Sequence, residues 1–440
     1  MERTSRPVER GIKKKSLKTG SDEKRKVERH SYDLVSIAEA LRRKLQTSAS
    51  FRSISKTFLI SKILYEQSCR SPSHTTIINW VHKIGYYQLT SKKEKADDWV
   101  LILDHSIQLG KEKVFVILGI REKNIDFTRP LQFHDLLPLR EISKEYWSGE
   151  IIRDCLIDLK NEIGNIKYAV GDHASCIKKG LEMAQIPHVH DVKHKMAIIL
   201  KRCYKNHDAF QSLIKEMADF RRNLQQTKFA CIIPPRQRAK ARYHNIDTVV
   251  QWGLKALQCV KKEQTEIAVK EKLQWILQYE DLLCELSALM KIVCEIEAHI
   301  KNFGISKTVT VKYSSILAKW PTQLPCENFN ILKNEFNVYL EKTLDQLPST
   351  PQILASSDII ESAFGKYKNY VSQNPMAGIT NLVLAIAAFT SSLELDEIKK
   401  ALESCTKADI ITWTQKFIGK TILQRRKGVF GALKKWNEQY

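Results

Sequence analysis

Apolar residues recur at two different periods along the chain, and the changes of period divide it into segments. Between residues 31 and 90 they follow the helical period, whereas from 97 to 200 they gather into short runs rich in β-branched and aromatic residues. From 205 to 350 the helical period returns with almost no strand pattern. We therefore expect a helical segment, a mixed α/β segment and a second helical segment.

The mixed segment predicts several strands with helices between them. Apolar runs predict strands at 100–103, 114–118, 168–170 and, more briefly, around 186–190. Helical spacing predicts helices over 146–159 and from Asp172 to about Ala184. A strand hairpin followed by alternating helices and strands is typical of a mixed α/β sheet.

One helix of the first segment has a polar face suited to nucleic acid. Ser73 is a good N-cap, and we expect the helix to end at Gly85. The polar face carries groups that could meet base edges or phosphates, namely His74, Thr75, Asn79, His82 and Lys83. The pattern favours a DNA-binding helix-turn-helix. The alternative is a plain amphipathic helix inside a helical subdomain.

Composition and charge narrow the functional classes. The 440 residues include 71 Lys and Arg against 49 Asp and Glu, a net charge of +22. A surface this basic attracts polyanions, most commonly nucleic acid, although an unspecialised basic protein remains the alternative. The ten Cys form no C-x-x-C pair, and no apolar run has the length of a membrane span. We expect a soluble, intracellular protein with a basic, disordered arm over residues 1–30.

A basic cluster interrupts the second helical segment. Pro234 and Pro235 break the helical pattern, and four cations follow, at Arg236, Arg238, Lys240 and Arg242. Such a cluster indicates binding to DNA phosphates, and a solvated basic turn is the alternative. Further cations lie near the C-terminus, at 425–427 and 434–435.

Three acidic residues stand out by their positions. Asp104 follows the apolar run that ends at Leu103, Asp172 follows the run over 168–170, and Glu361 lies in a helical stretch far downstream. A charge after a buried strand is costly unless it is paired or binds a metal, so two such strands suggest a site for divalent cations. Phosphoryl transfer on DNA uses such a site, with two ions roughly 3.5–4 Å apart.

Each acid also has a purely structural interpretation. Asp104 could be an ordinary strand-end carboxylate, and Asp172 could cap the helix that follows it. Asp358 and Glu361 have the spacing of a capping box. On a helical wheel, however, Glu361 aligns with Gly365 and Lys368 beside an apolar stripe, which suits a ligand next to a cation.

Histidines near the acids suggest two further hypotheses. The cluster His188-x-His190-Asp191-x-x-His194 could bind zinc, although its spacing matches no standard site and Asp191 could instead cap a helix. His105 and His173 directly follow Asp104 and Asp172, and we expect them near the same site, within reach of a substrate phosphate.

The order Asp104, Asp172, Glu361 resembles the DDE transposases of bacterial insertion sequences. The local matches are Leu103 to Ser106, Gly171 to His173 and Ile360 to Lys366, and the likeness covers about residues 95–200 and 350–390. Some of these families place a Lys seven residues after the Glu, as Lys368 does, but Leu354 and Ser357 replace their preceding Tyr and Arg.

The resemblance implies a fold and a domain order. It implies an α/β RNase H-like core with a mixed sheet, interrupted by a large all-α insertion and preceded by the helix-turn-helix domain. The implied divisions are a basic disordered arm (1–30), the helix-turn-helix domain (31–92), the first part of the core (93–204), the insertion (205–350), the second part of the core (351–400) and a basic helical C-terminal tail (401–440).

The resemblance also implies an activity. Asp104, Asp172 and Glu361 would hold two Mg²⁺ or Mn²⁺ ions for nicking and strand transfer of double-stranded DNA, with Lys366 and Lys368 as further DNA contacts. A homodimer or larger synaptic assembly in the cytoplasm, at the nucleoid of a bacterium, is implied. The alternatives are an RNase H-like nuclease that does not join DNA, and a transposase-derived regulator with an inert core.

Overall fold

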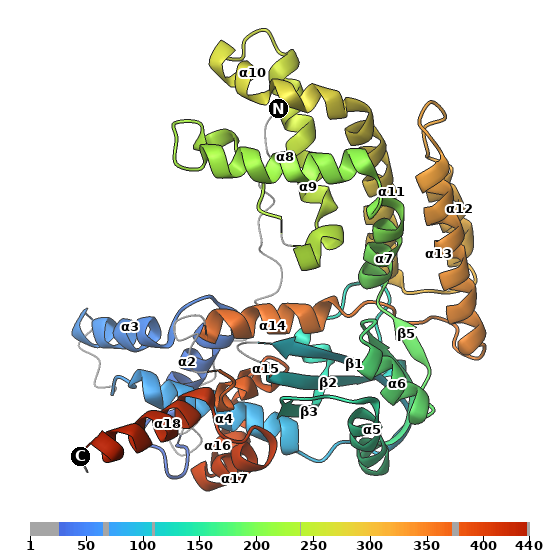
Figure 1. Cartoon of the computed structure of the whole chain (residues 1–440). Helices are drawn as coiled ribbons and strands as arrows, with labels where there is room; N and C mark the ends of the chain where they lie inside the picture. Colours follow the sequence, from blue (N-terminus) through green and yellow to red (C-terminus); the bar gives the residue numbers. More distant parts are fainter. Residues whose placement is uncertain (1–25, 65–69, 108–110, 238, 372–377, 438–440) are drawn as a thin grey trace.

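The structure is a computed structural model, and it describes residues 26–64, 70–107, 111–237, 239–371 and 378–437 (Figure 1). Of the basic arm expected over residues 1–30, residues 1–25 lie outside these ranges. In the described part of the chain, no helix is long and apolar enough to cross a membrane.

A five-stranded mixed sheet forms the centre of the molecule. Its strands are β1 (Ala96–Ile107), β2 (Lys113–Arg121), β3 (Leu137–Lys144), β4 (Gly164–Gly171) and β5 (His188–His190). The order across the sheet is β3-β2-β1-β4-β5. The strands β1, β2 and β3 pair antiparallel, whereas β4 and β5 run parallel to β1. The predicted mixed sheet is confirmed, although β3 carries too many charges to have been predicted.

The two faces of the sheet are covered by different helices. On one face, Trp99, Leu101 and Leu103 pack with α5 (Gly149–Ile163) and α6 (Ser175–Met183). Residues of the opposite parity, such as Val100 and Ile102, belong to the main core, where α14 (Asp358–Val371) contacts β1 (Figure 1). The helix predicted over 146–159 is therefore present as α5, three residues later at its start and four later at its end.

The first and last helices of the chain pack together beside the sheet. Their bounds are α2 (Leu34–Gln46), α3 (Phe51–Leu64), α4 (His74–Thr90), α15 (Ala385–Ala388), α16 (Leu395–Ser404) and α17 (Lys407–Phe417), with α18 (Ile422–Asn437) beyond them. The helix α4 contacts α2, α3, α15, α16 and α17. The segment expected to be a C-terminal tail thus begins inside α16, and α4 is the helix around which this layer is built.

The expected end of α4 at Gly85 is wrong. The helix continues to Thr90, and Gly85 is a point of close approach to the 3-10 turn η7 (Asn381–Leu384). A Cβ atom built on Gly85 would lie 1.9 Å from the backbone oxygen of Leu384. Glycine is thus needed here because another backbone passes too close for a side chain.

The long insertion between β5 and α14 stands away from the sheet (Figure 1). It follows α7 (Val192–Tyr204), and its helices are α8 (Asp208–Leu224), α9 (Ile246–Lys261), α10 (Ile267–Leu273), α11 (Glu280–Phe303), α12 (Val309–Leu317) and α13 (Glu327–Gln346). The insertion also contains short 3-10 turns at Ala230–Ile232, Ala239–His244 and Gln274–Tyr279. Two others, at Glu122–Asn124 and Phe133–Asp135, lie between β2 and β3. Within the described residues the insertion is helical, as predicted, and one β-bridge joins Ile305 to Ile353 where it returns to the core.

We predict that Gly85→Ala lowers the free energy of unfolding by about 1–3 kcal/mol, because the added methyl group meets a backbone that cannot move freely. Gly365→Ala is the matched control, since a Cβ there meets nothing within 4 Å. Its helix should gain about 0.5–1 kcal/mol. Urea unfolding followed by circular dichroism measures both values. Equal stabilisation by the two substitutions would contradict the close approach at Gly85.

The buried carboxyl of Glu141 should make the stability of the protein depend on pH. It is 1% exposed on β3, and burial raises the pKa of its carboxyl well above the usual value. A carboxyl with a raised folded-state pKa binds its proton more tightly when folded, so stability falls as pH rises above about 4.3, the unfolded-state value. Glu141→Gln should lose this decline between pH 5 and 8, relative to the exposed control Glu271→Gln. Parallel stability–pH curves for the two variants would show that Glu141 does not ionise on unfolding.

Candidate active site

Asp104 and Asp172 lie side by side at adjacent parallel strands. Leu103 pairs with Gly171 between β1 and β4, so Asp104, the next residue of β1, lies beside Asp172, the residue that follows β4. Asp104 has the same parity as Val100 and Ile102 and therefore faces the side covered by α14. The sequence expectation needs one correction, because β1 does not end at Asp104 but continues to Ile107.

Glu361 joins this pair from α14. The buried residues Ile360, Phe364 and Tyr367 fix the helix in the core, which confirms the predicted apolar stripe and leaves Glu361 half-buried on the adjacent face. Burial, together with the neighbouring carboxylates of Asp172 and Glu361, raises the pKa of Asp104 to about 7, against a hydrogen bond from the His105 amide and the charge of His194. The three predicted acids are thus brought within electrostatic reach of one another.

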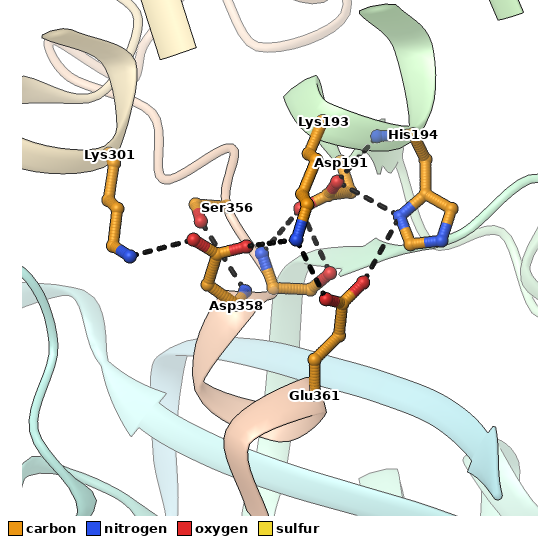
Figure 2. Close-up of polar contacts among 8 residues, drawn as sticks. Asp191, Lys193, His194, Lys301, Ser356, Asp358 and Glu361 are labelled. Carbon is orange, nitrogen blue, oxygen red and sulfur yellow. Dashed lines mark hydrogen bonds and ion pairs between the residues drawn. The ribbon is translucent and has the colours of Figure 1, made fainter. Parts of the chain in front are cut away.

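The structural alternatives for Asp172 and Glu361 do not hold. Asp172 accepts a hydrogen bond from the Ala174 amide at 2.9 Å, but the N-cap of α6 is Ala174, which has no side-chain cap. Asp358 is the first residue of α14 and not its cap. The Glu361 carboxylate pairs instead with Lys193 and His194 of α7 (Figure 2).

Glu361 is held by two cations of α7. Its Oε2 atom lies 3.2 Å from the Lys193 ammonium, and its Oε1 atom lies 3.8 Å from Nδ1 of His194 (Figure 2). Burial lowers the pKa of His194, but its bond to Asp191 and nearby carboxylates raise it to about 9, so His194 is protonated at neutral pH. Sequence reasoning missed Lys193. The sequence feature that could have indicated it is a cation in the first turn of a helix, where the helix dipole disfavours positive charge unless an acid is nearby.

Asp191 connects the start of α7 to the start of α14. Its side chain is 1% exposed and accepts hydrogen bonds from the His194 amide at 2.8 Å and from the Ser357 amide and hydroxyl at 2.7 and 2.9 Å (Figure 2). Burial opposes its ionisation, but these bonds and His194 hold its pKa below the usual value. The hypothesis that Asp191 caps a helix is confirmed, and the bonds to Ser357 set where α14 begins.

The insertion also reaches this site. Lys301 of α11 lies 2.7 Å from the Asp358 carboxylate, and the Lys193 ammonium lies 3.9 Å from the same group (Figure 2). The ring of His244, in the turn Ala239–His244, lies 4.9 Å from that of His194. The insertion therefore contacts the helix that carries Glu361.

The zinc hypothesis for the histidine cluster is wrong in the described part of the chain. Asp191 and His194 bond to each other. The rings of His173 and His190 stack with their centroids 3.8 Å apart, and the ring of His188 lies tilted against that of His190 at 4.2 Å. Among the described residues no three His, Cys, Asp or Glu side chains are arranged to hold a metal ion. The three acids likewise form no such group as they stand, and Glu361 is paired with Lys193.

His105 does not face the acids. Its ring packs against Phe115 at 4.8 Å and Trp147 at 5.2 Å, on the face of the sheet opposite Asp104. Alternation along a strand requires this result, since neighbouring residues point to opposite faces. The expectation that His105 lies near the site because it follows Asp104 in sequence is therefore wrong.

The polar face predicted to read DNA is covered in part. Thr75 is exposed and Asn79 half-buried, but His82 is 6% exposed. Lys83 donates a hydrogen bond to the Leu402 carbonyl of α16 at 2.8 Å. His82 and Lys83 thus face the C-terminal helices, and the expectation that they lie on an exposed recognition face is wrong.

The predicted basic contacts are only partly available. Arg236 and Lys368 are exposed. Arg242 donates to Gln211 at 3.0 Å. The Lys366 ammonium lies 4.4 Å from the centre of the Phe133 ring, which reduces its reach to solvent. Arg238 and the side chain of Lys240 lie outside the described part of the chain.

Comparison with known proteins adds little to this geometry. No protein-family model matches the sequence, and no curated protein matches it significantly. Among solved structures, the chain aligns with the "Drosophila P element transposase strand transfer complex" at a TM-score of 0.39 and 13% identity, over 82% of this chain and 92% of that one. At this TM-score and identity, the likeness establishes neither a shared family nor a shared fold.

We predict that Asp191→Ala lowers the free energy of unfolding by about 3–5 kcal/mol, because it breaks the pair between this buried carboxylate and the half-buried His194 and removes both bonds to Ser357. Ser357→Ala is the matched control: it removes one hydroxyl bond but keeps the amide bond, so its cost should be about 0.5–1.5 kcal/mol. Hydrogen exchange should show faster exchange at the start of α14 only in Asp191→Ala. Equal losses in both variants would contradict the role of Asp191 in fixing α14.

Proposed function

We propose that the protein is a DDE transposase, which binds the ends of a mobile DNA element and carries out metal-dependent strand cleavage and strand transfer. The observation that carries this proposal is that Asp104, Asp172 and Glu361 lie near enough to interact electrostatically at adjacent parallel strands and the helix α14. The first acid lies on the central strand, the second follows a neighbouring strand, and the third lies on a helix across that face. This is the arrangement that an RNase H-like core would have.

The donor set fits divalent cations of the Mg²⁺ type. All three candidate ligands are carboxylates, and hard oxygen ligands suit Mg²⁺ or Mn²⁺. The pKa of Asp104 is raised first by burial and then by the nearby carboxylates of Asp172 and Glu361, and a bound cation would offset both effects. Asp104, Asp172 and Glu361 would hold two such ions, which would stabilise charge on the attacking and leaving oxygens of a phosphodiester.

The residues of the chain itself set the geometry for that chemistry. Adjacent strands hold Asp104 and Asp172 rigidly, while Asp191 fixes the helix that carries Glu361. In the present arrangement Lys193 balances the charge of Glu361, so metal binding would require Glu361 to exchange this ion pair for an ion. The Lys193 ammonium would then be free to meet a phosphate of the DNA.

The proposed partner is double-stranded DNA. A net charge of +22 favours binding to a phosphate backbone, and Arg236, Lys368 and Thr75 are exposed for such contacts. Joining the two ends of an element to a target also requires a dimer or larger assembly, which belongs to the same proposal. Cleavage without joining, by an RNase H-like nuclease, would use the same acids.

One observation favours a second candidate, a transposase-derived DNA-binding regulator with an inert core. Glu361 is paired with Lys193 and His194, so the three acids are not arranged as a ligand set. A core that no longer binds metal could keep this ion pair permanently. Metal-dependent cleavage of DNA separates the two candidates.

We predict that Asp104→Asn, Asp172→Asn and Glu361→Gln each reduce Mg²⁺-dependent DNA cleavage by at least about 100-fold, while DNA affinity changes little. Glu335→Gln is the control, because Glu335 pairs with Lys195 and Arg202 outside the site. The measurement is nicking of a supercoiled plasmid that carries the DNA flanking the gene. Normal cleavage by any one acid variant would remove that residue from the site, and no cleavage by the unaltered protein would favour the inert core.

A further inference from the structure

The covered part of α4 encloses a cavity. The C-terminal helix α17 and the turn η7 lie over the polar face of α4, where sequence reasoning expected DNA contacts. Between them is a cavity of about 230 Å³. Closely packed helix faces do not leave such a space, so the polar residues that line it are open to contact with a ligand.

The lining is basic and carries an unpaired polar atom. Lys83 and Lys407 contribute to it, and among the described residues that line the cavity there is no carboxylate. His82 also lines it, and the Nε2 atom of this residue, which is 6% exposed, has no hydrogen-bond partner. A buried polar atom without a partner is costly, so a ligand that bonds to it would recover that energy. The ligand should be an anion that can form hydrogen bonds.

The remaining walls favour a flat heterocycle. Asn79 of α4 and Asn381 of η7 both line the cavity, and an Asn amide presents a donor and an acceptor side by side, the pattern that pairs with the edge of a base. Trp80 and Ile410 supply apolar surface. The cavity is smaller than the roughly 300–1,000 Å³ of sites for drug-sized molecules, which suits a single base.

We propose that this cavity binds one nucleotide, with its base between α4 and η7 and its phosphate at Lys407. The nucleotide could be free in solution, or it could belong to a DNA strand and be turned out of the base stack. Both sources present the same base and phosphate to the lining. The site is separate from the three acids, and it does not depend on the core being catalytic.

The test uses the full chain and two fluorescent probes. The first is the 5′-monophosphate of 2-aminopurine deoxyriboside, and the second is a 20-base-pair duplex with 2-aminopurine at one terminal position. We expect saturable quenching of at least one probe as the protein is added. Saturation only by the duplex would assign the site to a DNA strand, and saturation only by the monophosphate would assign it to a free nucleotide.

Two variants locate the binding. Asn79→Leu should weaken it by about tenfold, the equivalent of one lost base-edge pair, and Asn330→Leu on the exposed face of α13 is the matched control. Lys407→Ala should weaken probe binding several-fold, and it should not affect folding because Lys407 is exposed. Lys400→Ala, at another exposed lysine, should leave probe binding unchanged. The proposal fails if neither probe is quenched saturably, or if Asn79→Leu and Lys407→Ala both bind as the unaltered protein does.

Discussion

The arrangement of the site depends on one buried carboxylate. Asp191 stands at the end of β5, begins α7 and accepts two hydrogen bonds from Ser357, the residue before α14. It therefore joins the sheet edge, the insertion and the third candidate ligand at one point. A buried carboxylate is stable only when it is paired and hydrogen-bonded, and Asp191 meets both conditions through His194 and Ser357. The position of Glu361 over the sheet follows from this junction.

Charge balance is the second constraint on the site. Asp104, Asp172 and Glu361 repel one another, and the cations nearest to Glu361 both come from the first turn of α7. Lys301 extends the same network to α11, so the insertion contacts the helix that would change partners on metal binding. A movement of α11 would therefore change the contacts of α14. The insertion is therefore placed to influence whether Glu361 is available.

The three acids could be predicted from sequence because their signal is local. An apolar run that leads into an Asp places that residue on a buried strand, as at Asp104, or directly after one, as at Asp172, and two parallel neighbours bring such residues together. The strand β3 could not be predicted, because buried Glu141 and its neighbouring charges resemble a surface loop. The partners of α4 could not be predicted either. Amphipathic spacing shows that a helix has a polar face but not what covers it, and here that cover comes from residues more than 300 positions away. Lys193 was not predicted because its role depends on an ion pair with Glu361, and Glu361 is distant from it in sequence.

Replacement of Mg²⁺ by Fe²⁺ would test whether Asp104, Asp172 and Glu361 hold divalent metal ions together. With ascorbate and peroxide, bound Fe²⁺ generates radicals that cut the polypeptide where the ion lies. On the DNA-bound protein the account predicts cuts clustered near residues 104, 172 and 361, suppressed by excess Mg²⁺. Cuts near 104 and 172 without 361 would mean that Glu361 stays with Lys193, and the absence of cuts at all three would contradict the metal site.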